Sequence, residues 1–444
     1  MCININFNMH RILYRMLLPI LGMVLINPFN AAAGELIREG EVITLERCME
    51  IALSKHPNIL ATRNTVSINQ SKVGQAEANY YPQLNWSVGY KRYSSISGGT
   101  TGTITSREAA DSFDQYSSSV TLTQNIFDFG KTPAQVNIQG LLLDSSLSEL
   151  GNVSDQIVFN VKQAYYRVLQ AKRNRDVAIE TVQQFQKHLE QANGFYFVGT
   201  KPRFDVTKAE VDLSNARLNL IKSENALRIA IVNLNNTMGI PNVPDYTIED
   251  NLSFKEYNIS FEDAIKRANE NRPDLKSIIA KKDAAGNSIE LAKKGYYPVL
   301  TGNASYNWSG ERFPLEDGWN AGATLSFPLF SGFLTRYQVE ESRANLNVLE
   351  ANEELLRQNI FLEVRQAYLN IKEAEERITA TELTVKQAEE NLEVANGRYA
   401  AGVGNPIEVT DAEVVLSNAK TAYIQALYDY KIAQASLEKA VGVR

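Results

Sequence analysis

Four segments of the chain alternate between apolar and polar residues, which is the pattern of β-strands. They lie at about 83–93, 116–127, 299–308 and 319–329. In the first segment the apolar positions are Leu84, Trp86, Val88 and Tyr90. Each segment is about ten residues long, the length that a tilted strand needs to cross a lipid bilayer. The alternation therefore predicts four strands, each with one apolar and one polar face.

Outside these strands, apolar residues recur at three- and four-residue spacing, which predicts amphipathic helices. The expected helices lie at about 45–80, 130–198, 204–238, 260–296, 332–401 and 406–441. Pro57 and Pro273 predict a boundary within the first and the fourth, because proline suits the first turn of a helix. The two longest would form rods of roughly 100 Å, as in packed coiled coils. Each long helix is followed by a shorter one, which predicts two helical hairpins.

The two halves of the chain are copies of each other. The tripeptide YYP at 80–82 returns at 296–298, an offset of 216 residues. The stretch ANGFYFVG at 192–199 returns as ANGRYAAG at 395–402, an offset of 203 residues. Each copy therefore predicts the same unit, a strand hairpin joined to a helical hairpin.

The repeat divides the chain into three parts after its N-terminal segment. The first repeat spans 34–239, a proline-containing connector spans 240–258, and the second repeat spans 259–444. The fall in the offset means that the first copy carries 13 extra residues between Pro82 and Thr121. An insertion rich in glycine, serine and threonine is expected in an exposed loop.

The N-terminal residues 1–33 have the features of a secretory signal peptide. Basic residues precede an apolar core at 16–26, and three alanines at 31–33 offer a cleavage site. A membrane anchor is the alternative, but 11 apolar residues are too few to span a bilayer, which takes roughly 20. Only Cys48 remains after cleavage, so no internal disulfide is expected, and its helical spacing predicts an inert packing residue.

Composition narrows the class of function. The chain of 444 residues has a net charge of −6, which argues against a nucleic-acid partner because phosphate binding needs a basic face. Only three histidines occur, and we find no metal-ligand spacing, phosphate-binding loop or serine nucleophile motif. We therefore expect no catalytic residues, no metal and no cofactor, and predict that the protein is not an enzyme.

Four strands cannot close a barrel, and a sheet in a membrane cannot leave its edges unpaired. If the strands cross a membrane, several chains must supply them together. A soluble sheet with one wet face is an alternative for the strands. For the whole chain, the alternative is a structural periplasmic coiled coil or adhesin stalk without channel activity.

Several positions between the predicted elements are candidates for special roles. Pro82 and Pro298 mark the change from helix to strand, where proline ends the helical hydrogen bonding. Glycines suit the reversal between the helices of each hairpin, because a tight turn needs positive φ. The turn residues are Val198, Gly199 and Thr200 in the first repeat and Gly402, Val403, Gly404 and Pro406 in the second.

Two acids, Glu408 and Asp411, follow the second turn on one face of the next helix, where the first repeat has Asp205 and Lys208. Acids at a helix N-terminus commonly complement the helix dipole, and this structural role is the simpler interpretation. The alternative is a functional role at the far end of the rod.

A duplicated strand and helix hairpin behind a signal peptide resembles the TolC-like outer-membrane factor family. The resemblance covers nearly the whole mature chain. The motifs that carry it are ALSKHPNIL and ANENRPDL at the starts of the repeats, YYP, NIFDFG and FPLFSG around the strands, and the glycine-containing turns. The family's asparagine before proline is replaced here by His56 and Arg272.

This resemblance implies a mainly α protein with a membrane β-barrel portion. Three identical chains would form a 12-stranded barrel in the outer membrane of a Gram-negative bacterium and a tunnel of 12 helices in the periplasm. Such proteins are exit ducts for drug efflux pumps or type I secretion. They contact outer-membrane lipid and dock with a periplasmic adaptor and an inner-membrane transporter of the RND or ABC type.

The resemblance also implies roles for residues near the turns. Glu408 and Asp411 match inward-facing acidic rings that constrict the periplasmic entrance, and the turns match the adaptor contacts. Tyr399 and Asp205 match a tyrosine and an acid that bond across the closed mouth. A second bond of the family uses an arginine where this chain has Gly404. Lys201, Arg203 or Arg398 are then the candidates to replace that bond.

Overall fold

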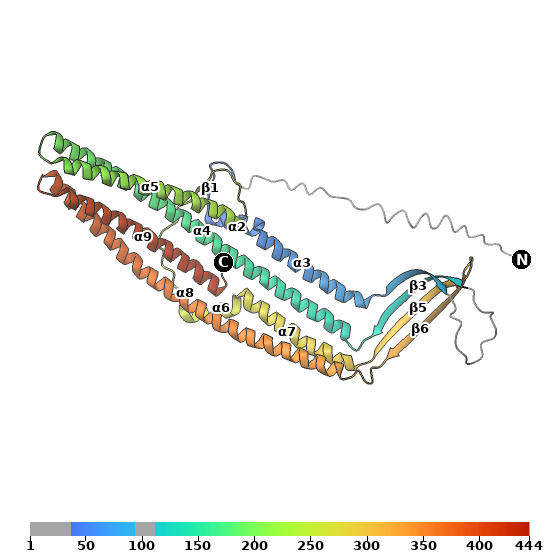
Figure 1. Cartoon of the computed structure of the whole chain (residues 1–444). Helices are drawn as coiled ribbons and strands as arrows, with labels where there is room; N and C mark the ends of the chain where they lie inside the picture. The colour runs from blue at the N-terminus through green and yellow to red at the C-terminus, as the bar shows by residue number, and fades with distance from the viewer. Residues whose placement is uncertain (1–36, 94–111, 444) are drawn as a thin grey trace, which may run out of the picture.

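The computed structural model describes residues 37–93 and 112–443. The molecule is elongated, with a sheet at one end and two helical hairpins that extend to the other (Figure 1). The predicted signal peptide and the glycine-, serine- and threonine-rich part of the predicted loop, 94–108, lie outside the described residues.

The sheet has four antiparallel strands in the order β2-β3-β5-β6. The strands are β2 at Gln83–Tyr93, β3 at Phe113–Phe127, β5 at Val299–Gly310 and β6 at Glu316–Ser326. The pairing of β3 with β5 joins the two repeats into one sheet. The last strand begins and ends three residues before the range expected from alternation, because Phe327 and the residues after it turn toward the next helix.

Two long helical hairpins form the body of the molecule. In the first repeat, α4 at Lys131–Phe197 packs against α5 at Arg203–Met238, and in the second, α8 at Leu334–Ala400 packs against α9 at Pro406–Val441. The packing of α4 against α9 joins the hairpins, so the helices lie in the order α5, α4, α9, α8. Both long helices have 67 residues, which corresponds to about 100 Å.

The helices expected at 45–80 and 260–296 are each divided in two. The first becomes α2 at Leu45–Lys55 and α3 at Pro57–Glu77, and the second becomes α6 at Phe261–Asn271 and α7 at Pro273–Lys293. A short 3₁₀ turn follows each, at Ala78–Tyr80 and Lys294–Tyr296. The residues at the two breaks, His56 and Arg272, have ψ of 128° and 124° because the proline that follows disfavours the helical conformation.

The break allows two helices to meet end to end. Helix α5 ends at Gly239, where φ is 77°, and a Cβ atom there would lie 2.9 Å from the Cα of His56. Helix α9 ends at Gly442 in the same way, with a Cβ only 3.0 Å from the backbone nitrogen of Arg272. Helix α3 therefore continues the line of α5, and α7 continues the line of α9 (Figure 1). In each repeat this composite helix extends toward the sheet beside the long helix, α4 or α8.

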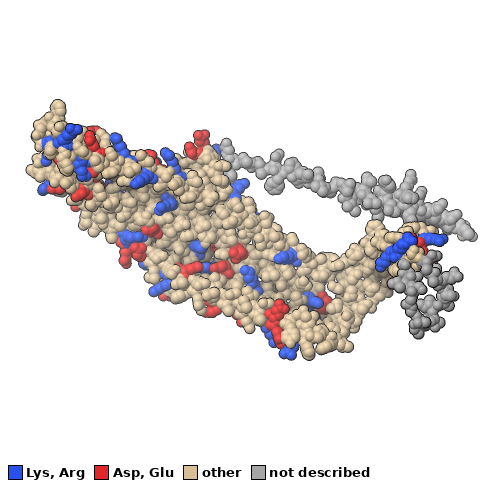
Figure 2. All heavy atoms as spheres, in the orientation of Figure 1, with Lys and Arg blue, Asp and Glu red and all other residues tan. Residues whose placement is uncertain are grey.

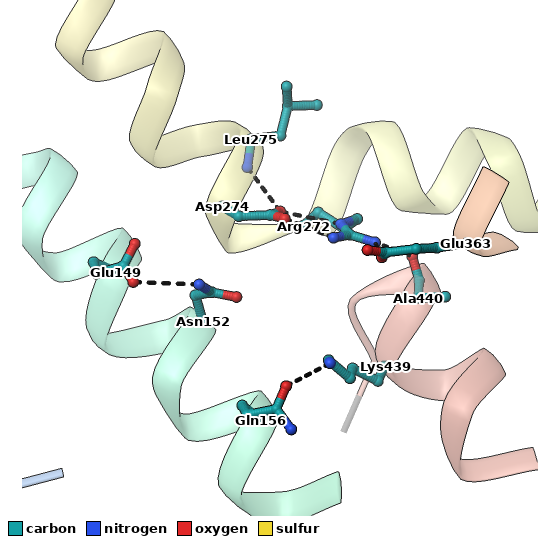
Figure 3. Close-up of polar contacts among 9 residues, drawn as sticks. All are labelled: Glu149, Asn152, Gln156, Arg272, Asp274, Leu275, Glu363, Lys439 and Ala440. Atoms are coloured by element: carbon teal, nitrogen blue, oxygen red, sulfur yellow. Dashed lines mark hydrogen bonds and ion pairs between the residues drawn. The ribbon is translucent and has the colours of Figure 1, made fainter. Parts of the chain in front are cut away.

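Arg272 ties the second of these junctions together (Figure 3). Its guanidinium donates to Asp274 at 2.6 Å and to Glu363 of α8 at 2.6 Å, and it reaches the carbonyl oxygen of Ala440 at the end of α9. The side chain of Arg272 is only 9% exposed. A buried, fully bonded arginine of this kind holds three helices in one arrangement.

The connector packs on the middle of the rod. Strand β1 at Val42–Ile43 pairs in parallel with β4 at Thr247–Ile248, and the hydroxyl of Tyr165 donates to the carbonyl oxygen of Glu249 at 2.7 Å. Cys48 is fully buried in the core beside this pair, and burial raises the pKa of its thiol to about 12. The thiol is therefore unreactive and serves packing.

Candidate functional site

One face of the sheet is apolar and the opposite face is polar, as the register shows. Residues paired across neighbouring strands share a face. Two apolar rows are Trp86, Val120, Tyr306 and Trp319, and Leu84, Leu122, Ala304 and Ala321. Two polar rows from the other face are Asn85, Thr121, Ser305 and Asn320, and Ser87, Ser119, Asn307 and Gly318.

The apolar face of the sheet is uncovered. Trp86 is 74% exposed and Trp319 is 75% exposed, and the helices lie beyond one end of the sheet rather than on its face (Figure 1). A contiguous exposed apolar surface of this kind marks a membrane or protein contact, because water is an unfavourable solvent for it.

Charged and aromatic residues bound this apolar band. The segments 83–90, 115–127, 299–310 and 318–326 contain no Asp, Glu, Lys or Arg. Figure 2 shows the charged side chains spread over the helical body and at the far end of the sheet. Aromatic rings gather at both limits of the band: Tyr93 stacks on Phe113 at the far end, and Phe129 stacks on Tyr297 beside the helices. Girdles of aromatic residues on either side of an uncharged band are typical of strands that cross a membrane.

The junction prolines lie between the helices and this band. Pro82 stands directly before β2 and Pro298 directly before β5, each after a 3₁₀ turn. Within the described residues, none of the helices combines the length and the apolar character that crossing a bilayer requires.

The two hairpin turns lie at the opposite end of the molecule. Gly199 and Gly402 both have φ of 78°, the conformation that the sequence predicted for the reversals. The apolar residues around the turns face solvent: Phe197 is 91% exposed and Val403 is 72% exposed. No three acidic, histidine or cysteine side chains in the described ranges, 37–93 and 112–443, are grouped to hold a metal ion.

Gly404 has a different role from the one expected. Its φ is not positive, so the turn does not need glycine there for that reason. A Cβ atom at this position would lie 2.7 Å from the backbone nitrogen of Tyr399 and 2.8 Å from the carbonyl carbon of Arg398. Close packing of the turn on the end of α8 therefore requires glycine and leaves no room for the family's arginine.

Lys201 links the first turn to the second. Its Nζ donates to the carbonyl oxygen of Gly404 at 3.4 Å and lies 5.6 Å from the centre of the Tyr399 ring. Of the three basic residues considered for this role, Lys201 makes the contact between the turns. Arg398 instead pairs with Glu408 within the second turn, at 3.2 Å.

Tyr399 is fully buried at the tip and joins the two hairpins. Its ring lies against His188 and Phe195 of α4, with ring centres 5.0 Å and 5.5 Å apart. The hydrogen bond expected between Tyr399 and Asp205 is not formed: the Tyr399 hydroxyl has no hydrogen-bond partner in the part of the chain that the structure describes. The two groups are still close enough to interact: burial, and then the charge of Asp205, raise the pKa of Tyr399.

A buried polar group that the sequence did not indicate also joins the tips. Asp212 of α5 is 8% exposed and accepts hydrogen bonds from Lys208 at 2.6 Å and from Thr410 of α9 at 3.0 Å. Asp205 is 4% exposed and lies on the same helix. The first repeat thus contributes two buried acids here, whereas the acids expected at the tip from the second repeat, Glu408 and Asp411, are exposed.

Glu408 and Asp411 are exposed at the start of α9. Glu408 is paired with Arg398, and the exposed fractions of the two side chains are 47% and 54%. Both acids are therefore exposed on the surface of the single chain, which is required of residues that face a pore. The pairing with Arg398 was not expected, and it reduces the negative charge that Glu408 presents.

Sequence reasoning also missed Glu413 of α9. Its side chain is 4% exposed, in the seam between α9 and α4. Burial, and then the charge of Glu180, raise the pKa of Glu413 to about 7, although Lys420 opposes this. Its repeat equivalent, Glu210, is exposed. Both copies have Glu at this position, so the sequence does not show that only Glu413 is buried.

Comparisons with known proteins agree with this architecture. The sequence model of the family described as outer membrane efflux protein matches residues 49–240 and 264–443. The outer membrane protein TolC of Escherichia coli K12 is 24% identical over 399 residues, covering 84% of this chain and 76% of its own. The alkaline protease secretion protein AprF of Pseudomonas aeruginosa is 24% identical over 352 residues, covering 74% of this chain and 70% of its own. Among solved structures, that of CusC has a TM-score of 0.78 at 17% identity, covering 93% of this chain and 98% of that one.

Proposed function

Because this chain belongs to the outer membrane efflux protein family, we propose that it is an outer-membrane exit duct. It would conduct substrates passively from an inner-membrane transporter across the periplasm and the outer membrane, in a tripartite efflux pump or a type I secretion system. The observation that carries the proposal is the uncovered sheet, which has one apolar face, one polar face and an uncharged band between two groups of aromatic rings. A periplasmic stalk has no use for such a sheet.

The sheet in turn requires partner chains. Strands β2 and β6 lie at its edges, and unpaired edges are not tolerated in a membrane. We propose that β6 of one chain pairs with β2 of the next, as β3 pairs with β5 within the chain. Three chains would close a 12-stranded barrel whose apolar face contacts lipid and whose polar face lines the pore.

The helical body supports the same closure. Helices α5 and α8 lie at its two edges, and both have apolar residues seven or fourteen positions apart that are at least about half exposed. These are Phe204, Val211, Leu218 and Val232 on α5, and Val348, Leu355, Leu362 and Leu369 on α8. Heptad stripes without a partner favour packing against another helix. The occupant we propose is the complementary edge of a second copy, giving a tunnel of 12 helices in the trimer.

The internal repeat supplies the register of this contact. Within the chain, Thr181 of α4 lies 3.4 Å from Ser417 of α9, measured between the hydroxyl oxygens. The equivalent residues after the 203-residue offset are Thr384 of α8 and Ser214 of α5, which are the same residue types. Thr384 of one chain would therefore lie beside Ser214 of the next.

Cysteine cross-linking tests the closure. The double variant Thr384→Cys with Ser214→Cys is expected to form covalent species up to a trimer in oxidising conditions. The pair Thr207→Cys with Thr384→Cys is a matched control, because it is out of register by two helical turns, about 10 Å. Cross-linking of the control as efficiently as the test pair, or none in either, would contradict the arrangement.

The hairpin turns would face the periplasmic adaptor. Exposed apolar side chains at Val198, Phe197 and Val403 are suited to pack against another protein. In this arrangement Glu408 and Asp411 lie near the axis, where three chains bring six carboxylates together. Tyr399 and Asp205 lie behind them in the wall, and Lys201 holds the two turns of each chain together.

Transport by cells tests the function itself. Removing the gene should sensitise the cells to substrates of its pump, or stop secretion of its protein cargo, and the intact chain should restore export. Fractionation should place the chain in the outer membrane. No step of this function calls on a catalytic residue or a cofactor. A soluble protein in the periplasm, without any export defect on deletion, would favour the stalk.

A further inference from the structure

Two polar atoms are left without partners where the hairpin tips meet. Among the described residues, the Nδ1 atom of His188 and the hydroxyl of Tyr399 have no hydrogen-bond partner, although His188 is 5% exposed and Tyr399 is 0% exposed. A buried polar atom without a partner costs free energy that a solvated one does not. The closed tip therefore keeps two groups in an environment that favours their release to water.

His188 of α4 lies close to groups from α8 and α5. Its ring lies against that of Tyr399 from α8, and the charged groups that act on it are Asp205, Lys208 and Asp212 from α5. The uncharged hydroxyl of Thr410 from α9 donates to Asp212, and Phe195 of α4 packs on the other partner, Tyr399.

We propose that His188 is an acid-sensitive latch on the gate: when its imidazole takes up a proton, the two hairpins of the chain separate at their tips. The proposal deepens the proposed function, on which it rests, by assigning a regulator to the entrance of the duct. Tyr399 is the side chain that moves, because its ring lies between His188 and Phe195 and crosses from one hairpin to the other.

The direction of the effect follows from the surroundings of His188. Burial lowers the pKa of His188 below 6.5, and the charges of Asp212 and Asp205 only partly oppose this, while Lys208 adds to it. The closed tip thus favours the neutral imidazole, and a tip open to water restores the ordinary pKa. The closed form is fully favoured above pH 6.5 and loses that advantage as the pH falls below it.

The size of the effect is limited by the ordinary pKa. Between pH 7.5 and pH 5.5, the ratio of separated to closed tips can rise by at most about tenfold for each chain. Glu413, in the seam between α4 and α9, also takes up a proton as the pH falls through about 7, but its neutral form favours the packed seam and so opposes separation of the hairpins. Growth of the separated form that requires His188, and that persists when Glu408 and Asp411 are replaced by amides, therefore belongs to His188.

Distances between spin labels on the two turns test the latch. The labels replace Phe197 and Val403, exposed apolar residues at the first and the second turn, in the full chain reconstituted as an oligomer in lipid. Dilution with unlabelled chains ensures that each oligomer holds a single labelled pair. Cys48 is buried and will not compete for the label.

The expected result is a separated population that grows severalfold between pH 7.5 and pH 5.5. The variants His188→Gln and His188→Phe should remove that growth, while Glu408→Gln with Asp411→Asn should keep it. Two variants of His188 are used because one of them could fail to fold, which would be seen as loss of the heat-resistant oligomer. The other variant then provides the test. An unchanged distance in the natural chain, or the same acid response in both His188 variants, would overturn the latch.

Bilayer conductance at pH 7.5 separates this outcome from failure of the proposed function. Channels that conduct at pH 7.5 but show no acid response in their tip distances would leave the duct intact and reject the latch alone. A chain that inserts no channels would reject the duct itself.

Discussion

The hydroxyl of Thr410 donates to the carboxylate of Asp212 at 3.0 Å, a bond between residues 198 positions apart that joins the tips of the two hairpins. Asp212 also accepts from Lys208, so its charge is balanced within its own helix. Thr410 thus adds a neutral donor on a buried, paired acid to the contacts that Lys201 and Tyr399 make between the tips.

Replacing this donor should loosen the tip. We expect Thr410→Val to weaken the contact between the hairpins by about 1–2 kcal/mol, because a buried acceptor loses a partner while the shape is kept. Channels of the variant should open more often in planar bilayers. The control is Thr207→Val at the equivalent position of the first repeat, where the hydroxyl is exposed and bonds only within its helix. Equal gating of the two variants would argue against the tip contact as a restraint.

Arg272 is expected to be the most sensitive residue of the helix junctions. Arg272→Gln removes a buried cation and leaves Asp274 and Glu363 unpaired, which should lower the free energy of unfolding by about 3 kcal/mol. Thermal unfolding in detergent measures the loss. Arg267→Gln, on the exposed face of α6, should change stability by less than about 0.5 kcal/mol. A loss of similar size from both changes would mean that the junction is not specifically dependent on Arg272.

Glu413 should make the seam between α4 and α9 sensitive to alkaline pH. Its pKa of about 7 lies above the ordinary 4.5, so the folded seam favours the protonated acid. The stability contributed by the neutral form is present below pH 4.5 and is lost as the pH rises through 7, up to about 3 kcal/mol.

The variant Glu413→Gln should therefore be more stable than the natural chain at pH 8.5 and similar to it near pH 5. The melting temperature at the two pH values provides the measurement. Glu210→Gln, the exposed equivalent in the first repeat, should show no such difference. If Glu413→Gln lowers stability at pH 8.5, the acid is paired and charged rather than buried and neutral.

The exposed acids at the start of α9 should control cation block. Removing both, as Glu408→Ala with Asp411→Ala, should weaken the block of channels by divalent cations in planar bilayers, because the entrance loses six carboxylates. Glu210→Ala, an acid on the outer part of α5, is the comparison. If the double variant remains as sensitive to cations as the natural chain, the proposal that these acids form a ring at the entrance is wrong.

The sequence predicted the elements of this fold because their signals are local. Alternation in β2 and heptad spacing in α4 are visible in a few neighbouring residues, and the repeat confirmed each reading in a second copy. The breaks at His56 and Arg272 were predicted as well, because Pro57 and Pro273 mark them. The end-to-end contact of Gly239 with His56 could not be read from the sequence, since it depends on how α5 and α3 pack.

The tip was harder to predict than the fold. Gly404 was expected to serve a positive φ, whereas close packing on Tyr399 is what requires it. His188 and Asp212 were missed because their surroundings come from other helices. One signal was available: both break the repeat, since the equivalents of His188 and Asp212 are Asn391 and Val415. Polar residues that differ between copies of a repeat indicate positions that the shared fold does not explain.

Single-channel recording tests the central claim most directly. The full chain, extracted from outer membranes in detergent and added to a planar lipid bilayer at pH 7.5, should insert as a heat-resistant trimer and produce discrete, long-lived steps of conductance without any energy source. A trimer that never conducts, or a chain that is released from cells as a soluble species without detergent, would contradict the account.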